Sequence, residues 1–233
     1  MSSPALKVCG ITGREDAWAA VSAGADAIGF VFWPRSPRAV SADVARAIAR
    51  GLPPFVTRVG VFVDATPEEM RAVVSHVGLD VLQLHGDETP DVLGVVGVRA
   101  LKAVGRRGAA LAEAAGAWPT DVPIVVDAVA PTRRGGTGER ADWVAAARLA
   151  IERPVILAGG LTPENVADAI RQVRPWGVDV ATGVEADRGE PGQKDARKVK
   201  AFIDAAKGAL PVEDEPSGFD ELGPYDWMQD DTL

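Results

Sequence analysis

The sequence predicts an α/β chain folded as a (β/α)8 TIM barrel, a single domain with an acidic C-terminal extension. Eight short apolar runs alternate with helix-like runs from near the N-terminus to about residue 208. The apolar runs are continuous, as expected of strands that are buried on both faces. No second zone of composition interrupts them, so one domain is expected. A doubly wound open sheet is the structural alternative, and the count of eight strands favours the closed barrel.

The predicted strands are short, as in Ile124-Val125-Val126 and Val155-Ile156-Leu157. Parallel strands joined through helices end on one rim of a barrel, and enzymes with this fold carry their catalytic groups on that rim. Polar residues at the ends of these strands are therefore candidates for function. The predicted strands span residues 6–10, 26–32, 57–63, 80–84, 99–104, 123–127, 154–158 and 178–182.

Helix start signals lie between the strands. Thr66-Pro67-Glu68-Glu69 offers an N-cap threonine, a proline at the first helical position and a glutamate at the capping-box position. Thr89-Pro90 and Thr162-Pro163 predict the same start, and Ser41 and Asp195 are predicted to cap two further helices. The last helix is predicted to bury a stripe formed by Val199, Phe202, Ile203 and Ala206.

Composition and charge exclude several classes of protein. Apolar residues make up 47% of the chain, and no apolar run approaches the ~18 residues that a membrane span needs. The net charge is -8, and residues 211–233 hold 8 of the 33 acidic residues with no Lys or Arg. The rest of the chain is formally neutral, so no basic surface for nucleic acid is predicted. We expect a catalytic barrel over residues 1–210 and an acidic, disordered tail over 211–233.

Cys9 is the only cysteine, so the chain cannot form an intramolecular disulfide. The segment Met1-Ser2-Ser3-Pro4-Ala5 lacks the basic and apolar regions of a signal peptide. Both observations predict a cytoplasmic protein. A monomer and a homodimer are equally compatible with the sequence.

The position of Cys9 favours a functional thiol. It ends the first strand, in Leu6-Lys7-Val8-Cys9-Gly10, although free cysteine also packs as a small hydrophobe and a buried structural thiol is the alternative. Placement on the predicted rim favours catalysis. Lys7 shares the strand face of Cys9, and we expect its charge to help lower the thiol pKa, which is near ~8.5 when unperturbed.

Asp127 ends the sixth strand, where a carboxylate has to be hydrogen-bonded, paired or functional. An N-cap or an ion pair with Arg133 is the alternative, and the rim position favours function. The loop continues through Arg134 to Gly135-Gly136-Thr137-Gly138, a stretch that suits a moving lid.

Two other rim segments carry polar side chains. The segment Phe32-Trp33-Pro34-Arg35-Ser36-Pro37-Arg38 is stiffened by two prolines and presents two arginines, which match a planar carboxylate through bidentate contacts. Solvated surface charges are the alternative. His85 ends the fourth strand without a companion histidine nearby, so a hydrogen-bonding role is favoured over a metal site.

Glycines follow the last two strands. One run is Ala158-Gly159-Gly160-Leu161, and the other is Asp179-Val180-Ala181-Thr182-Gly183-Val184-Glu185. Glycine lets the backbone approach a ligand closely, and the loops after strands seven and eight form the recurrent phosphate site of such barrels. Helix capping alone is the alternative, but two such loops after the last two strands favour a phosphate site.

Together these segments resemble the phosphoribosylanthranilate isomerase family, barrel enzymes of tryptophan biosynthesis. The resemblance covers roughly residues 6–208, in order, with every rim loop included. It rests on Lys7-Val8-Cys9-Gly10-Ile11-Thr12, on residues 24–32, 58–63, 83–86, 135–138 and 159–166, and on the strand-eight loop, residues 179–185, with Lys194-Asp195.

The resemblance implies an Amadori rearrangement, an aldose–ketose isomerisation that uses no metal or organic cofactor. N-(5′-phosphoribosyl)anthranilate would become 1-(2-carboxyphenylamino)-1-deoxyribulose 5-phosphate. Asp127 would be the general acid, Cys9 the general base, and Arg38 the residue that holds the anthranilate carboxylate. Asp179 would contact a hydroxyl or an amine of the substrate. The phosphate would be held by backbone groups around Gly159, Gly160, Thr182 and Gly183.

The chemistry requires an acid that keeps its proton near neutral pH, which burial of Asp127 would favour. The chain departs from the family at Ala181-Thr182, where the family has paired serines, so phosphate contact is expected to depend more on backbone N–H groups.

Three rival interpretations remain. They are the related histidine-pathway sugar isomerase, which carries Asp in place of Cys9 and needs a second phosphate site, a lyase or synthase barrel with a catalytic Lys or Glu, and a non-catalytic phosphate-binding barrel.

Overall fold

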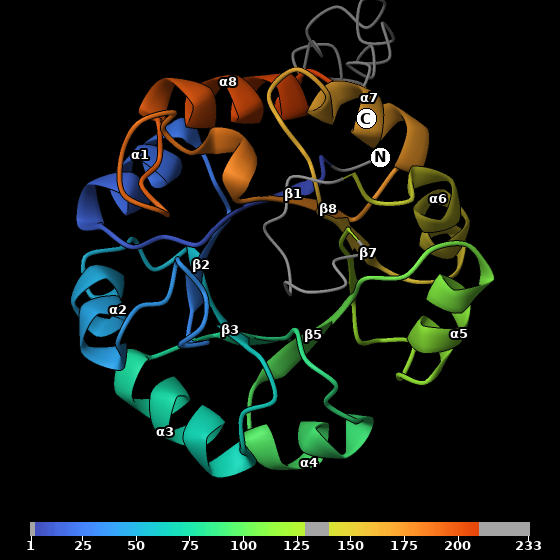
Figure 1. Cartoon of the computed structure of the whole chain (residues 1–233), viewed down its shortest axis with the longest axis horizontal. Helices are drawn as coiled ribbons and strands as arrows, with labels where there is room; N and C mark the ends of the chain where they lie inside the picture. The colour runs from blue at the N-terminus through green and yellow to red at the C-terminus, as the bar shows by residue number, and fades with distance from the viewer. Residues whose placement is uncertain (1–2, 129–139, 210–233) are drawn as a thin grey trace, which may run out of the picture.

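The computed structural model describes residues 3–128 and 140–209, in which a ring of helices surrounds a closed barrel of parallel strands (Figure 1). The strands follow one another in sequence order, and the last pairs with the first. This confirms the predicted (β/α)8 barrel, and each strand boundary lies within two residues of the prediction. The strands are β1 (Ala5–Cys9), β2 (Ala27–Val31), β3 (Thr57–Phe62), β4 (Val81–Leu84), β5 (Arg99–Val104), β6 (Ile124–Val126), β7 (Val155–Leu157) and β8 (Gly177–Val180).

Helices connect the strands and cover the outside of the barrel. Two short 3-10 helices, η1 (Pro90–Val92) and η2 (Thr182–Val184), precede α4 and follow β8. The α-helices are α1 (Arg14–Ala23), α2 (Ala42–Ala49), α3 (Pro67–Val77), α4 (Leu93–Val96), α5 (Ala109–Gly116), α6 (Trp143–Glu152), α7 (Val166–Val173) and α8 (Ala196–Lys207).

Three of the predicted helix caps are confirmed. The Thr66 hydroxyl accepts a hydrogen bond from the Glu69 N–H, and the Glu69 carboxylate accepts one from the Thr66 N–H, which completes a capping box. Ser41 and Asp195 cap α2 and α8 through their side chains. The four apolar residues of the predicted stripe in the last helix are all buried.

One predicted helix start is wrong, and another lacks its side-chain cap. Helix α7 begins after Asn165 and not after Thr162, because Asn165 first closes a turn. Its Oδ1 accepts from the Thr162 N–H at 2.9 Å, and its Nδ2 donates to the Gly160 carbonyl at 2.9 Å. The start at Thr89-Pro90 is confirmed in position, since η1 begins at Pro90 and continues directly into α4, but Thr89 makes no side-chain cap hydrogen bond.

The apolar core has two parts. The larger lies between the strands and the helices, and it includes Leu6 and Val8 of β1. Because side chains alternate along a strand, Lys7 and Cys9 then face the barrel interior. The apolar part of that interior is formed by Val59, Val81, Leu101, Ala103, Val125, Ile156 and Ala158.

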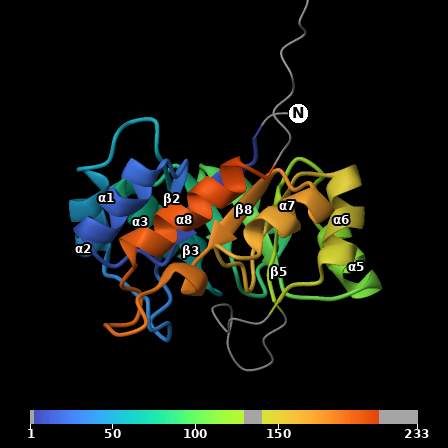
Figure 2. The ribbon, with the colours of Figure 1, turned by 90° about the horizontal axis from the view of Figure 1, so that it is seen from above.

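The loops after β2 and β8 project from the same end of the barrel (Figure 2). Among the described residues, no helix is long and apolar enough to cross a membrane. The predicted tail over 211–233 lies outside the described residues, so the tail and the domain boundary at residue 210 stay predictions.

Candidate active site

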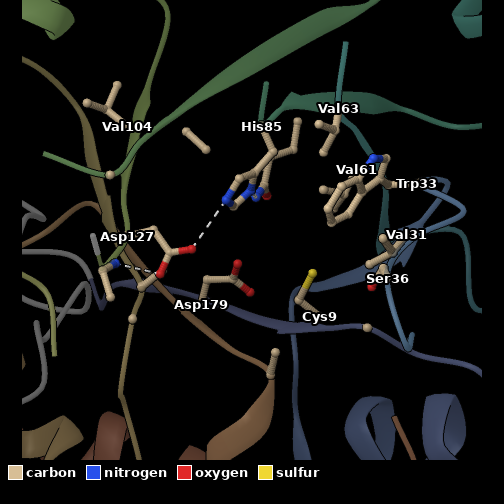
Figure 3. A pocket seen from close by; sticks show the side chains of 18 of the residues that line it. Cys9, Val31, Trp33, Ser36, Val61, Val63, His85, Val104, Asp127 and Asp179 are labelled. Atoms are coloured by element: carbon tan, nitrogen blue, oxygen red, sulfur yellow. Dashed lines mark hydrogen bonds and ion pairs between the residues drawn. The ribbon is translucent and has the colours of Figure 1, made fainter. Parts of the chain in front are cut away.

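A cavity of about 1420 Å³ opens at the carboxyl ends of the strands. It is large enough for a small-molecule ligand, since such sites usually measure ~300–1,000 Å³. Figure 3 shows the central side chains of this cavity, with Asp179 between Asp127 and Cys9. The roles of the predicted site residues stay predictions, but all eight line this one cavity: Cys9, Arg38, Asp127, Gly159, Gly160, Asp179, Thr182 and Gly183.

Cys9 is buried at the end of β1, beside Gly29 of β2 in the strand register. A Cβ atom on Gly29 would lie 2.6 Å from the Cys9 Sγ, so the glycine makes room for the thiol. Burial raises the pKa of the Cys9 thiol, the charge of Lys7 opposes this rise, and the charge of Asp179 adds to it. Lys7 therefore acts in the direction expected from the sequence, but burial outweighs it.

Lys7 and Asp179 form a buried ion pair beside the thiol. The register of β1 and β8 places them opposite each other, and Lys7 Nζ donates to Asp179 Oδ2 at 2.7 Å. Burial alone would lower the pKa of Lys7, but the charges of Asp179 and Cys9 and the hydrogen bond raise it to about 12, so Lys7 stays protonated. Burial raises the pKa of Asp179, and Lys7 opposes this.

The second oxygen of Asp179 is available for a ligand. Asp179 Oδ1 is buried and has no hydrogen-bond partner among the described residues. A buried polar atom without a partner is costly, so a group that donates to it from the cavity would bind favourably.

Asp127 follows β6 directly and is buried. The Ala128 N–H donates to its Oδ1 at 2.7 Å, and His85 Nε2 lies 3.3 Å from its Oδ2 (Figure 3). Gly159 has a φ of +71°, and a Cβ atom there would lie 2.9 Å from the same Oδ1. Glycine is therefore required beside Asp127 for both conformation and space.

His85 is oriented by Gln83, two residues earlier. Gln83 is buried in β4, and its Nε2 lies 3.0 Å from His85 Nδ1. With the amide N–H donating to Nδ1, the ring proton is on Nε2 and is directed toward Asp127. The hydrogen-bonding role expected for His85 agrees with this geometry. Sequence reasoning missed Gln83, although its position on the strand face of His85 was visible.

The glycine loops after β7 and β8 pack against each other. Gly160 has a φ of +66°, and a Cβ atom on Gly183 would lie 1.9 Å from the Leu161 carbonyl oxygen. Both loops need glycine at these contacts. They bring backbone groups of two rim segments together on the cavity wall, as a phosphate cradle requires.

Arg38 reaches the cavity across the end of β1. A Cβ atom on Gly10 would lie 2.5 Å from the Arg38 Cδ, so Gly10 makes room for this side chain. Its guanidinium already binds a protein carboxylate: Nε donates to Glu185 Oε1 at 2.5 Å, and Nη2 donates to Glu185 Oε2 at 3.0 Å. Nη2 also donates to Thr182 Oγ1 at 3.1 Å, which links Arg38 to the predicted phosphate loop.

Glu185 and Lys194 are charged residues to which sequence reasoning assigned no role. Lys194 is buried, and its Nζ lies 3.2 Å from Glu185 Oε1 and 3.1 Å from the Ala181 carbonyl oxygen. Both residues lie in segments that carry the family resemblance. The contact of Glu185 with Arg38 had no signal in the spacing, because the two residues are 147 positions apart.

A second buried ion pair supports the loop after β4. Lys102 Nζ donates to Glu88 Oε2 at 2.8 Å and to the Gly86 carbonyl at 2.6 Å. The Glu88 carboxylate accepts from the Gly86 N–H in turn. These contacts hold the backbone immediately after His85.

The part of the chain that the structure describes contains no group of three or more His, Cys, Asp or Glu side chains arranged to hold a metal ion. The predicted lid with Arg133, Arg134 and residues 135–138 lies outside the described residues, so it stays a prediction.

Comparison with known proteins agrees with this geometry. Residues 6–205 match the family described as N-(5′-phosphoribosyl)anthranilate (PRA) isomerase. The isomerase of that name from Pseudomonas fluorescens is 49% identical over 210 residues, 89% of this chain and 100% of that protein. The one from Geobacter sp. is 47% identical over 205 residues, 87% of this chain and 97% of that protein.

Solved structures give the same result. The phosphoribosyl anthranilate isomerase of Thermotoga maritima is similar with a TM-score of 0.81 and 43% identity, covering 88% of this chain and 99% of that one. A phosphoribosyl anthranilate isomerase in complex with reduced 1-(o-carboxyphenylamino)-1-deoxyribulose 5-phosphate is similar with a TM-score of 0.78 and 42% identity, at the same coverage. This chain therefore belongs to the N-(5′-phosphoribosyl)anthranilate isomerase family.

Proposed function

We propose that this chain converts N-(5′-phosphoribosyl)anthranilate to 1-(2-carboxyphenylamino)-1-deoxyribulose 5-phosphate in tryptophan biosynthesis. One observation carries the assignment of the site: a thiol, Cys9, and a carboxyl group, Asp127, face the same cavity as Arg38 and the two glycine loops. These groups supply a base, an acid, a carboxylate partner and a phosphate cradle, which are the parts that this substrate needs.

In the first step, Asp127 donates its proton to the furanose ring oxygen. The bond between C1′ and that oxygen breaks, and the nitrogen lone pair forms a C=N bond, so the sugar opens to a Schiff base. The Ala128 N–H and His85 orient the Asp127 carboxyl group from both of its oxygens. An acid held in this way can be aligned with the ring oxygen.

In the second step, the Cys9 thiolate takes the proton from C2′. The electrons of that C–H bond form the C1′=C2′ bond and neutralise the nitrogen, which gives an enolamine. A proton then returns to C1′ while the 2′-hydroxyl loses its own, and the ketose product results. The charge of Lys7 supports the thiolate against the effect of burial.

The substrate would be held at both ends. The glycine loops around Gly160 and Gly183 would accept the phosphate through backbone N–H groups, and Arg38 would bind the ring carboxylate. The free Oδ1 of Asp179 would accept a hydrogen bond from a sugar hydroxyl or from the amine. No metal or organic cofactor enters these steps, because acid, base and hydrogen-bond donors account for every bond that changes.

The test is a continuous fluorescence assay. N-(5′-phosphoribosyl)anthranilate would be generated in place and its loss followed with the wild type, Cys9→Ala and Asp127→Asn. We expect turnover by the wild type and a loss of about 100-fold or more in each variant, with melting temperatures that show both variants to be folded. A folded wild type without turnover would refute the function, and full activity in either variant would refute that residue's role.

We also propose a cytoplasmic location, which the lone cysteine supports.

A further inference from the structure

We propose that Glu185 and Lys194 are positioning residues that make Arg38 selective for a carboxylate on the ligand. This inference rests on the proposed function, since it states how the ring carboxylate of that substrate would be recognised. The cluster formed by Arg38, Glu185 and Lys194 is called the carboxylate cluster below.

The carboxylate cluster fixes the plane of the Arg38 guanidinium. Glu185 accepts from Nε and Nη2 in a bidentate contact, with distances of 2.5 and 3.0 Å. A bidentate contact sets both the direction and the rotation of a guanidinium, which a single hydrogen bond does not. Within residues 3–128 and 140–209, hydrogen bonds of the Arg38 guanidinium are made by Nε and Nη2. Nη1 is therefore left for a ligand, and the contact with Glu185 fixes its orientation before the ligand binds.

Glu185 lies behind Arg38 as seen from the cavity. Of the four described residues joined in this network, Arg38 and Thr182 line the cavity, whereas Glu185 and Lys194 do not. Glu185 therefore does not occupy space that a ligand carboxylate would take. The loops that carry Arg38 and Glu185 project from the same end of the barrel (Figure 2), and their contact joins the two loops.

Lys194 keeps Glu185 in place and adds positive charge. Its side chain is fully buried, and it holds both the Glu185 carboxylate and the Ala181 carbonyl. Burial would raise the pKa of Glu185, but the hydrogen bond from Arg38 and the charges of Lys194 and Arg38 lower it, so the carboxylate stays ionised. A further acid nearby, Asp16 of α1, accepts a hydrogen bond from the Lys194 backbone N–H.

The carboxylate cluster thus has two cations for one internal carboxylate. A ligand carboxylate on Arg38 would complete a second ion pair in a partly buried place, where hydrogen bonds between charged groups are strong. An uncharged ring would leave Arg38 with a hydrogen-bonding edge that it cannot satisfy. The expected result is discrimination between ligands that differ only in this carboxylate.

The experiment compares the binding of two probes by calorimetry. One is reduced 1-(o-carboxyphenylamino)-1-deoxyribulose 5-phosphate, and the other is the same compound with a plain phenyl ring. The ratio of their Kd values measures the carboxylate preference. We expect a ratio of about 100 for the wild type, falling to about 10 or less in Glu185→Gln, because a charged hydrogen bond corresponds to roughly 10- to 100-fold in affinity. Lys194→Met should lower the ratio in the same direction.

A double-mutant cycle shows whether Glu185 acts through Arg38. Arg38→Met should abolish the preference, and adding Glu185→Gln to it should cause no further loss. Asp187→Asn is the matched control, because Asp187 lies in the same loop, is exposed and contacts Lys198. It should keep the wild-type ratio.

Two results would overturn the inference. If Glu185→Gln weakened both probes equally, its role would be structural only. If Glu185→Gln raised the ratio of the two Kd values, Glu185 would compete with the ligand carboxylate for Arg38. Failure of the proposed function looks different, because then neither probe would bind the wild type at all.

Discussion

His85 Nε2 lies 3.3 Å from Asp127 Oδ2, so a ring from the end of β4 reaches the carboxyl group at the end of β6. The opposite ring nitrogen contacts Gln83 at 3.0 Å. The two contacts fix the orientation of the ring, so that its Nε2 proton is directed toward Asp127. The acid of the proposed mechanism is thereby held by a chain of two side chains that do not react themselves.

Replacing His85 should slow the reaction more than it weakens binding. In His85→Leu we expect kcat to fall by about 10- to 100-fold, with KM changed less than about threefold, because the orientation of the acid is lost. His85→Asn keeps a donor and should recover part of kcat. His76→Leu, on α3, is the control in steady-state kinetics. Wild-type kcat in His85→Leu would refute the positioning role.

Removing Lys7 should raise the pKa of the Cys9 thiol further. Lys7 opposes the rise that burial causes, so its loss favours the neutral thiol and moves the pH profile of alkylation to higher pH. The measurement is the rate of reaction with iodoacetamide against pH in Lys7→Met, with Lys200→Met as an exposed control. An unchanged midpoint in Lys7→Met would show that Lys7 does not act on the thiol.

Adding one methyl group at Gly29 should damage the site without unfolding the barrel. The Cβ atom of Gly29→Ala would lie 2.6 Å from the Cys9 Sγ, so the thiol has to move. We expect kcat to fall by about tenfold or more, since small displacements of a reacting group are costly. Gly94→Ala meets nothing within 4 Å and should keep full activity. Equal kinetics of the two variants would contradict this reading.

Asp80 should contribute stability only above acidic pH. Arg58 donates to both of its carboxylate oxygens at 2.8 Å, and these hydrogen bonds lower the Asp80 pKa. A carboxyl group with a lowered pKa in the folded state stabilises fully above its unfolded pKa of ~3.9. This stabilisation is lost as the pH falls through the folded value.

The corresponding variant is Asp80→Asn. The pair is about one third exposed, so we expect only about 1 kcal/mol less free energy of unfolding at pH 7. Urea unfolding at several pH values should show this difference shrinking below about pH 4. A difference that stays constant down to pH 2 would exclude the ion pair as its source.

Arg153 should be required for stability and not for catalysis. Its guanidinium is directed to four carbonyl oxygens, those of Ala115, Trp118, Pro119 and Val122, which close the segment after α5. Arg153→Met would remove a donor from all four carbonyls, of which Ala115 and Pro119 keep the backbone N–H groups of Trp118 and Val122. We expect a loss of about 2–4 kcal/mol in the free energy of unfolding. Exposed Arg171→Met should change it by less than about 0.5 kcal/mol. A matching loss in both variants would disprove the specific role.

The strands were predictable because each is buried on both faces and therefore reads as one continuous apolar run. The predicted site residues could be found from the sequence for a related reason, since every one lies near a strand end or in the loop that follows it. The first residue of α7 could not be predicted from the sequence. Thr162-Pro163 has the local pattern of a cap, but Asn165 makes the competing turn. The Thr162 hydroxyl and Asn165 Oδ1 accept from different N–H groups, and local chemistry alone does not rank two such turns.

The side-chain contacts inside the site could not be predicted from the sequence either. Lys7 and Asp179 are 172 positions apart, and Arg38 and Glu185 are 147 apart. Only the strand register decides that Lys7 meets Asp179, and register depends on all eight strands together. Sequence reasoning therefore named the candidate acid and base, and it missed the contacts between distant residues that surround them.

The pair of Lys7 and Asp179 is also the seam where the barrel closes, because it joins the first strand to the last. During synthesis, Lys7 and Cys9 leave the ribosome long before Asp179 exists. The thiol of a partly made chain therefore lacks the buried ion pair of Lys7 and Asp179 that lies beside it in the folded barrel. Contacts this distant in sequence form late in folding, because closing so long a loop is slow. Catalytic turnover during refolding should accordingly report the closure of the barrel itself.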